Sequence, residues 1–121
     1  MGETYTPRVQ VWELDRLPVV VHKPEVIRSD DDANRVIVLQ LPAGESLDEH
    51  QVHEHALVFV LDGHAVVRAG DEQHRLSAPA LVHFPPAERH AVEAVSDCRL
   101  VLCLAPWPGV GHPTRRAEER A

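Results

Sequence analysis

Residues 44–63 read GESLDEHQVHEHALVFVLDG and decide how the rest of the chain is interpreted. Three histidines, His50, His53 and His55, come directly before residues 56–61, all of which are apolar. A continuous apolar run of this length predicts a strand that is buried on both faces. The Asp62-Gly63 pair that follows is typical of a β-hairpin turn into a returning strand. This stretch therefore predicts a histidine-rich segment that leads into a buried central strand.

Other short segments with the pattern of strands lie on both sides of this stretch. Turn signals built from proline, glycine, serine and aspartate separate them at intervals of roughly 8 to 12 residues, and no helical period is sustained before the tail. We expect an all-β protein with a closed or double-layered antiparallel sheet. Besides residues 56–63, the predicted strands are 9–14, 19–22, 26–28, 35–42, 64–69, 72–76, 80–84, 90–95 and 98–105.

Length and composition restrict the possible function classes. The 121 residues suit one domain, 1–121, with a core at 34–105, N-terminal strands within 9–28 and a tail at 106–121. The net charge of −7 and the scattered basic residues argue against nucleic-acid binding. No run approaches the roughly 20 apolar residues of a membrane span, and the start lacks the pattern of a secretory signal. We expect a soluble, cytoplasmic protein without a nucleic-acid or membrane partner.

The spacing within residues 44–63 resembles the first motif of the cupin superfamily, a group of small jelly-roll barrels. That motif places a glycine, two histidines, a glutamate and a final glycine at fixed distances. Aligned on Gly44, it finds His50 and Gly63 where the family has a histidine and a glycine. Val52 stands in place of the second histidine, and Ala56 stands in place of the glutamate.

A second motif of the same superfamily resembles the segment FPPAERH at 84–90. Aligned on Pro85, it finds His90 where the family has a histidine. Pro79 and Ala87 replace its two glycines, and Ala94 replaces its asparagine. The resemblance covers roughly residues 34–105 and implies an antiparallel jelly-roll barrel, the double-stranded β-helix of cupins.

In cupins, the motif histidines and the glutamate hold a divalent metal inside the barrel, so the resemblance implies metal ligands at His50 and His90. His53 and His55 follow in the connection at the barrel mouth and are candidates to complete a three-histidine set. Such a set suits zinc, nickel, iron, manganese or copper and leaves a position open for water or substrate. Glu54 and Glu88 are the nearest carboxylates that could supplement it.

Two functions remain open at this point. One is a metal-dependent cupin enzyme, of the oxygenase or isomerase type, which activates water, dioxygen or a hydroxy-carbonyl substrate. The other is a metal-free pocket that binds a small apolar or weakly anionic molecule without catalysis. The two barrel histidines would contribute to this pocket, and its predicted walls are Val52, Ala56, Val58 and Phe84.

Some residues outside the motifs also carry expectations. Val82 and Phe84 alternate with His83, which predicts that His83 faces away from the core. Cys98 and Cys103 lie five positions apart on one predicted strand and should therefore leave its opposite faces as free thiols. Small cupins commonly form homodimers, and we expect one here. Its candidate contacts are Trp12 and the apolar run 19–21.

Overall fold

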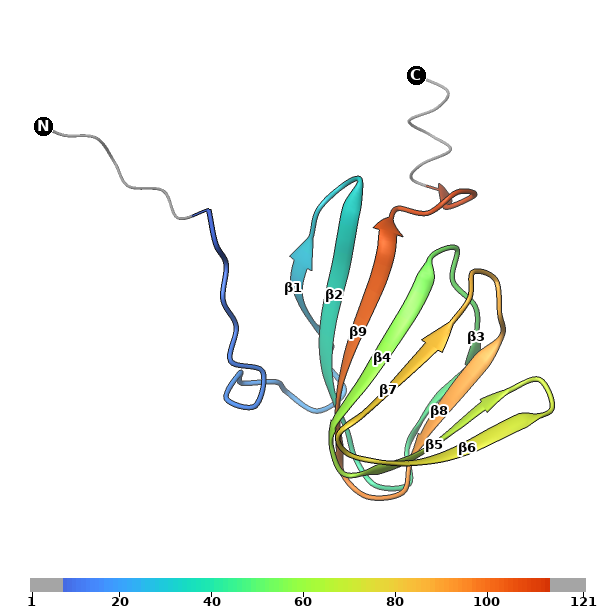
Figure 1. Ribbon diagram of the computed structural model, residues 1–121. Helices are drawn as coiled ribbons and strands as arrows, with labels where there is room; N and C mark the ends of the chain where they lie inside the picture. Colours follow the sequence, from blue (N-terminus) through green and yellow to red (C-terminus); the bar gives the residue numbers. More distant parts are fainter. Residues whose placement is uncertain (1–7, 114–121) are drawn as a thin grey trace, which may run out of the picture.

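The computed structural model describes residues 8–113 of the chain (Figure 1). Strands dominate this range, and each is short, as the spacing of turn signals predicts. Within the same range, no helix has the length and apolar character needed to cross a membrane. The strands are β1 (Glu25–Ser29), β2 (Ala33–Leu41), β3 (Ser46–His50), β4 (His55–Asp62), β5 (His64–Ala69), β6 (Glu72–Ser77), β7 (Ala80–Phe84), β8 (His90–Ala94) and β9 (Cys98–Trp107).

The strands form two antiparallel sheets that face each other as layers (Figure 1). The first has the order β1-β2-β9-β4-β7 and the second the order β3-β8-β5-β6. The chain passes between the layers at β2–β3, β3–β4, β4–β5, β6–β7, β7–β8 and β8–β9, as in a jelly roll. Strand pairing in the described range does not close the two sheets into one barrel. The predicted all-β, antiparallel jelly-roll fold is confirmed.

Alternation along the strands builds the core between the two sheets. In β4, Val58 and Val60 are almost completely buried, whereas the intervening Phe59 lies half-buried on the other face. Val67 of β5 and Val92 of β8 cover the same core from the second sheet. Burying a valine-sized side chain contributes roughly 1.5–3 kcal/mol, so this layer is a main source of stability. His55 is the first residue of β4, so alternation relative to this core face determines on which side of the sheet its ring lies.

Gly63 turns the chain from the first sheet to the second. Its φ is +87°, and a Cβ atom there would lie 2.1 Å from the carbonyl oxygen of Asp97, so only glycine fits. The prediction that β4 and β5 pair as a hairpin is wrong. Strands β9 and β7 already occupy both edges of β4, and β5 pairs with β6 and β8. The Asp-Gly pair marks the turn correctly but does not specify the partner strand.

The N-terminal segment departs from the sequence prediction. Residues 8–24 contain no strand, so the strands predicted at 9–14 and 19–22 are wrong, whereas the one at 26–28 is confirmed within β1. Val9 and Val11 are 75% and 78% exposed. Alternation of apolar and polar residues produces a strand only where a partner strand accepts its hydrogen bonds, and none in the described range pairs with this segment.

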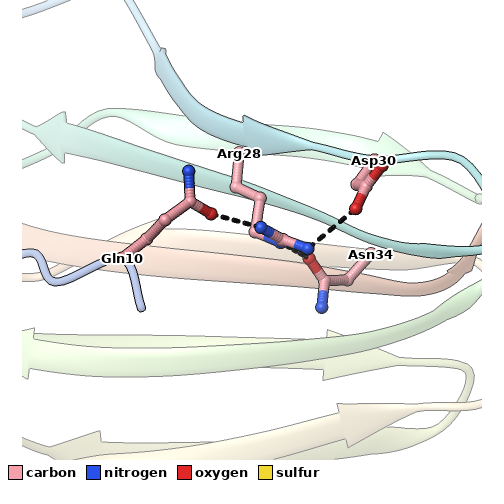
Figure 2. A network of polar contacts seen from close by, with 4 residues as sticks. All are labelled: Gln10, Arg28, Asp30 and Asn34. Carbon is pink, nitrogen blue, oxygen red and sulfur yellow. Dashed lines mark hydrogen bonds and ion pairs between the residues drawn. The ribbon is translucent and has the colours of Figure 1, made fainter. Parts of the chain in front are cut away.

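Two arginines fasten this N-terminal segment to the first sheet. Arg99 of β9 donates hydrogen bonds from Nη1 to the carbonyl oxygens of Leu14 and Leu17, at 2.7 and 2.8 Å. Arg28 of β1 donates to three side chains around it (Figure 2), those of Gln10, Asp30 and Asn34. The segment is therefore attached to the first sheet through polar contacts rather than through strand pairing.

The cysteine prediction is confirmed. Both thiols are free, with Cys98 buried against the core and Cys103 half-buried. Burial raises the pKa of both thiols. The organisation of all 121 residues as one domain stays a prediction, because residues 1–7 and 114–121, including half of the predicted tail, lie outside the described range.

Candidate functional site

The two motif histidines meet at one end of the jelly roll. His50 is the last residue of β3 and His90 is the first residue of β8, and the two are partners in the pairing of these strands. Their ring centroids lie 4.4 Å apart, with the ring planes tilted by 57°. The structure thus brings together the two histidines that the cupin motifs select. We call them the inner pair.

Backbone carbonyl groups determine the tautomer of both rings. Nδ1 of His50 lies 2.8 Å from the carbonyl oxygen of Asp48, and Nδ1 of His90 lies 2.9 Å from that of Glu88. A carbonyl oxygen only accepts hydrogen bonds, so Nδ1 is the protonated nitrogen in both rings. In the neutral form, each Nε2 therefore carries a lone pair that can accept a hydrogen bond or bind a metal ion.

The two rings differ in their exposure to solvent. His90 is 3% exposed and stacks flat on Phe84, with the ring centroids 3.9 Å apart and an angle of 6° between the planes. Burial lowers the pKa of His90, and the nearby His50 lowers it further, while Glu88 opposes both effects. His90 is thus held in its neutral form. His50 is only half-buried and is the more accessible member of the pair.

The other two predicted metal ligands lie elsewhere. His55 begins β4, and its Nδ1 lies 2.8 Å from Nε2 of His83 on β7. Both rings are exposed, while the next residue in each strand, Ala56 and Phe84, is buried in the core. His55 and His83, the outer pair, therefore lie on the face of the first sheet that points away from the core. This position confirms the outward orientation predicted for His83.

His53 also lies apart from the inner pair. Its ring is exposed and contacts the ring of His112 edge-on, with 5.7 Å between their centroids. His112 in turn contacts Trp107 at 4.7 Å. His53 belongs to the connection between β3 and β4, as predicted, and faces the loop that follows β9. Of the two carboxylates considered as further ligands, Glu54 is engaged differently, since it accepts a hydrogen bond from the amide of Gly109.

The residues predicted to line the ligand pocket form part of the packed core. Ala56, Val58 and Phe84 are at most 3% exposed, and Val52 packs against them. Five cavities of 110–310 Å³ lie along the described range, and neither His50 nor His90 lines any of them. Of the inner pair, only His50 has more than slight exposure to solvent.

The donor set does not fit a metal ion held by protein ligands alone. Within residues 8–113, no group of three or more histidine, cysteine, aspartate or glutamate side chains is placed to hold one. Zinc sites use three or four protein ligands, and non-haem iron uses two histidines and a carboxylate. The inner pair supplies two imidazoles, and apolar Val52 and Ala56 occupy the positions of the other two ligands in the cupin motif.

A known protein family matches the part of the chain that carries the inner and outer pairs. The family model described as Cupin domain matches residues 37–105, which is more than half of the chain. The chain belongs to the cupin family. The matched range begins in β2 and ends in β9, so it includes the inner pair and the outer pair. No curated protein matches this cupin chain.

Solved structures support the same cupin fold. An RmlC-like cupin with a double-stranded β-helix fold from Methanocaldococcus jannaschii is similar over 93% of this chain and 99% of its own, with a TM-score of 0.68 and 16% identity. A cupin superfamily protein from Desulfitobacterium hafniense is similar over 84% and 94%, with a TM-score of 0.66 and 14% identity. A conserved protein of unknown function from Streptococcus pyogenes is similar over 82% and 89%, with a TM-score of 0.65 and 21% identity. At these identities the likeness concerns the fold alone.

Two features of this end of the cupin domain were not predicted from the sequence. One is the contact between His55 and His83, although strand alternation already placed His83 outside the core. The other is the burial of Glu54, which is 1% exposed. No local sequence pattern predicts this burial, because the loop that covers Glu54 lies more than fifty positions later in the chain.

Proposed function

We propose that this cupin binds a small molecule at the mouth of the jelly roll through the Nε2 atoms of His50 and His90. The observation that carries the proposal is the pair of hydrogen bonds from Nδ1 to backbone carbonyl oxygens. These bonds leave two adjacent imidazoles with free acceptor atoms beside an apolar core. Adjacent acceptors suit a ligand with two neighbouring O–H or N–H donors, and His50 is the member of the pair that such a ligand reaches first.

Binding by neutral imidazoles does not require a resident metal ion. The lowered pKa of His90 supports this, because it keeps the ring neutral, and hence its Nε2 an acceptor, near neutral pH. The alternative is that the same Nε2 atoms bind a transition metal whose remaining positions are filled by water or ligand, since metal-bound histidines also donate their other N–H to carbonyl groups. Metal-dependent enzyme activity of the oxygenase or isomerase type belongs to this alternative.

A titration with a diol tests the proposal. The probe is cis-1,2-cyclohexanediol, its control is the corresponding dimethyl ether, and imidazole ¹⁵N chemical shifts are the readout. We expect saturable shifts at Nε2 of His50 and His90 with the diol and none with the ether. The shifts should disappear in His50→Ala and persist in His55→Ala. Equal responses in wild type and His50→Ala, or none in either, would overturn the proposal.

Metal analysis decides between the two versions of this site. Protein purified without a histidine tag is dialysed against zinc, nickel, iron, manganese or copper and then against metal-free buffer. We expect no stoichiometric metal to remain. Stoichiometric metal in the wild type that is absent from the His50→Ala, His90→Ala double variant would establish the metal-dependent version instead.

We further propose that the protein is a cytoplasmic homodimer. Exposed apolar residues on the N-terminal segment support association, since Val9, Val11 and Val20 are each more than half exposed. The predicted contacts at Trp12 and residues 19–21 belong to the same segment. Analytical ultracentrifugation at micromolar concentration should give twice the mass of one chain, and replacing Val11 and Val20 by serine should shift the protein toward monomer. A monomeric wild type would contradict this.

A further inference from the structure

A cavity lies between the β3–β4 connection and the loop that follows β9. Its volume is about 280 Å³, which suits a small molecule rather than a large cofactor. Figure 1 shows both segments at the same end of the molecule. The residues that line it are Gln51, Val52, His53, Glu54, Leu104, Trp107, His112 and Pro113.

Glu54 is the unusual member of this lining. It is 1% exposed, and its Oε2 accepts a hydrogen bond of 2.8 Å from the amide of Gly109. Within the part of the chain that the structure describes, Oε1 has no hydrogen bond and no ion pair. A buried carboxylate oxygen without a partner is costly, because its interaction with water is lost without replacement. Among residues 8–113, no lysine or arginine lines the cavity to offset this cost.

Anchoring of the loop that follows β9 accounts for only one of the two oxygens of the Glu54 carboxylate. A Cβ atom at Gly109 would lie 2.7 Å from the carbonyl oxygen of His53 and 3.1 Å from Cγ of Glu54, so glycine permits the close approach of the loop. The hydrogen bond from Gly109 then fixes the loop through Oε2. A neutral glutamine could accept the same hydrogen bond. The negative charge and the second oxygen therefore call for another partner.

The other walls of the cavity are apolar and aromatic. Leu104 and Val52 contribute apolar surface, and Trp107, His53 and His112 contribute rings. Arg35, which does not line the cavity, lies over the Trp107 ring, with its Cζ 4.8 Å from the ring centroid. This indole therefore already attracts one guanidinium group. Aromatic rings near a buried carboxylate are the elements with which proteins bind organic cations. The net charge of −7 favours the approach of such ligands.

We propose that this cavity binds a small organic cation with N–H donors, of the alkylguanidinium or alkylammonium class. A nitrogen of the ligand donates to Oε1 of Glu54, and its alkyl chain lies against Leu104 and Trp107. The site is separate from the inner pair, because neither His50 nor His90 lines it. It can therefore be tested independently of the diol site.

The test is an NMR titration of the full-length ¹⁵N-labelled protein with n-propylguanidinium in amine-free buffer. We expect saturable shifts at the Trp107 indole N–H and the Gly109 amide. Tetramethylammonium, which has charge but no N–H donor, and 1-butanol, which has no charge, should bind at least tenfold more weakly. Absence of saturable shifts, or equal binding of any of these probes, would overturn the proposal.

Variants connect the binding to the Glu54 carboxylate. Glu54→Gln keeps an acceptor for Gly109 and should weaken n-propylguanidinium binding at least tenfold. The matched control is Glu72→Gln, at a side chain that is 72% exposed on β6, and its affinity should be unchanged. His53→Lys, at an exposed position, places a competing ammonium group at the rim and should also weaken binding at least tenfold. Wild-type affinity in either Glu54→Gln or His53→Lys would show that the carboxylate is structural only.

Discussion

The inner and outer pairs use the same residue type on neighbouring strands, yet their chemistry differs. In the inner pair, both Nδ1 atoms donate to backbone carbonyl groups, which leaves both Nε2 atoms as the acceptors of the neutral rings. In the outer pair, Nδ1 of His55 and Nε2 of His83 are hydrogen-bonded to each other. The difference arises from the sheet face that each pair occupies, because one pair lies between the sheets and the other lies on the outer face of the first sheet. A histidine-rich segment is thus divided into a potential binding site and a surface contact.

The largest expected difference between the pairs is in stability. His90→Ala removes a buried ring that stacks on Phe84 and should lower the free energy of unfolding by about 2–4 kcal/mol. His83→Ala removes an exposed ring and should cost less than about 1 kcal/mol. Urea unfolding followed by tryptophan fluorescence measures both values. Equal losses in the two variants would contradict the assignment of an inner and an outer pair.

The next effect concerns the pH dependence of stability. The pKa of His90 is lowered from its ordinary value of 6.5, chiefly by burial, so the unfolded chain binds this proton more readily than the folded one. The free energy of unfolding should therefore fall as the pH drops below 6.5 toward the folded-state pKa. The slope from this one group is at most about 1.4 kcal/mol per pH unit.

His90→Gln tests this directly, because it removes the titrating group and keeps a polar side chain. Between pH 6.5 and 5, its free energy of unfolding should fall less steeply than that of the wild type. If His90→Gln and the wild type lose stability in parallel, His90 does not have the lowered pKa described above.

The smallest effect is the coupling within the outer pair. A double-mutant cycle of His55→Ala and His83→Ala should give a coupling of about 0.5–1 kcal/mol, the usual contribution of a hydrogen bond near the surface. The same cycle between His55 and His74, which lies on the second sheet, should give none. A coupling of zero between His55 and His83 would mean that their contact does not persist in solution.

The fold was largely predictable because its information is local. Proline, glycine and aspartate mark most strand ends, and the predicted strand at 80–84 coincides with β7. Pairing partners are not local, which explains the error at Gly63, where a turn signal compatible with a hairpin connects two sheets. The predicted strands at 9–14 and 19–22 fail for the same reason. Their alternation is present, but the partner that would make it a strand is not.

The site was predictable to the extent that motif spacing reflects strand geometry. The spacing selected His50 and His90, and the pairing of β3 with β8 brings these two together. It could not place His53 or His55, because neither stands at a motif position. The environment of Glu54 could not be predicted from the sequence either, since it depends on the distant Gly109.

The central claim is that both rings of the inner pair present an unprotonated Nε2. A long-range ¹H–¹⁵N spectrum of the histidine side chains at pH 7.5 tests it most directly, because the two nitrogens of each ring show different shifts when only one is protonated. The account predicts the Nδ1–H tautomer for His50 and His90, with the signals assigned through His50→Ala and His90→Gln. An Nε2–H tautomer at either ring would contradict it.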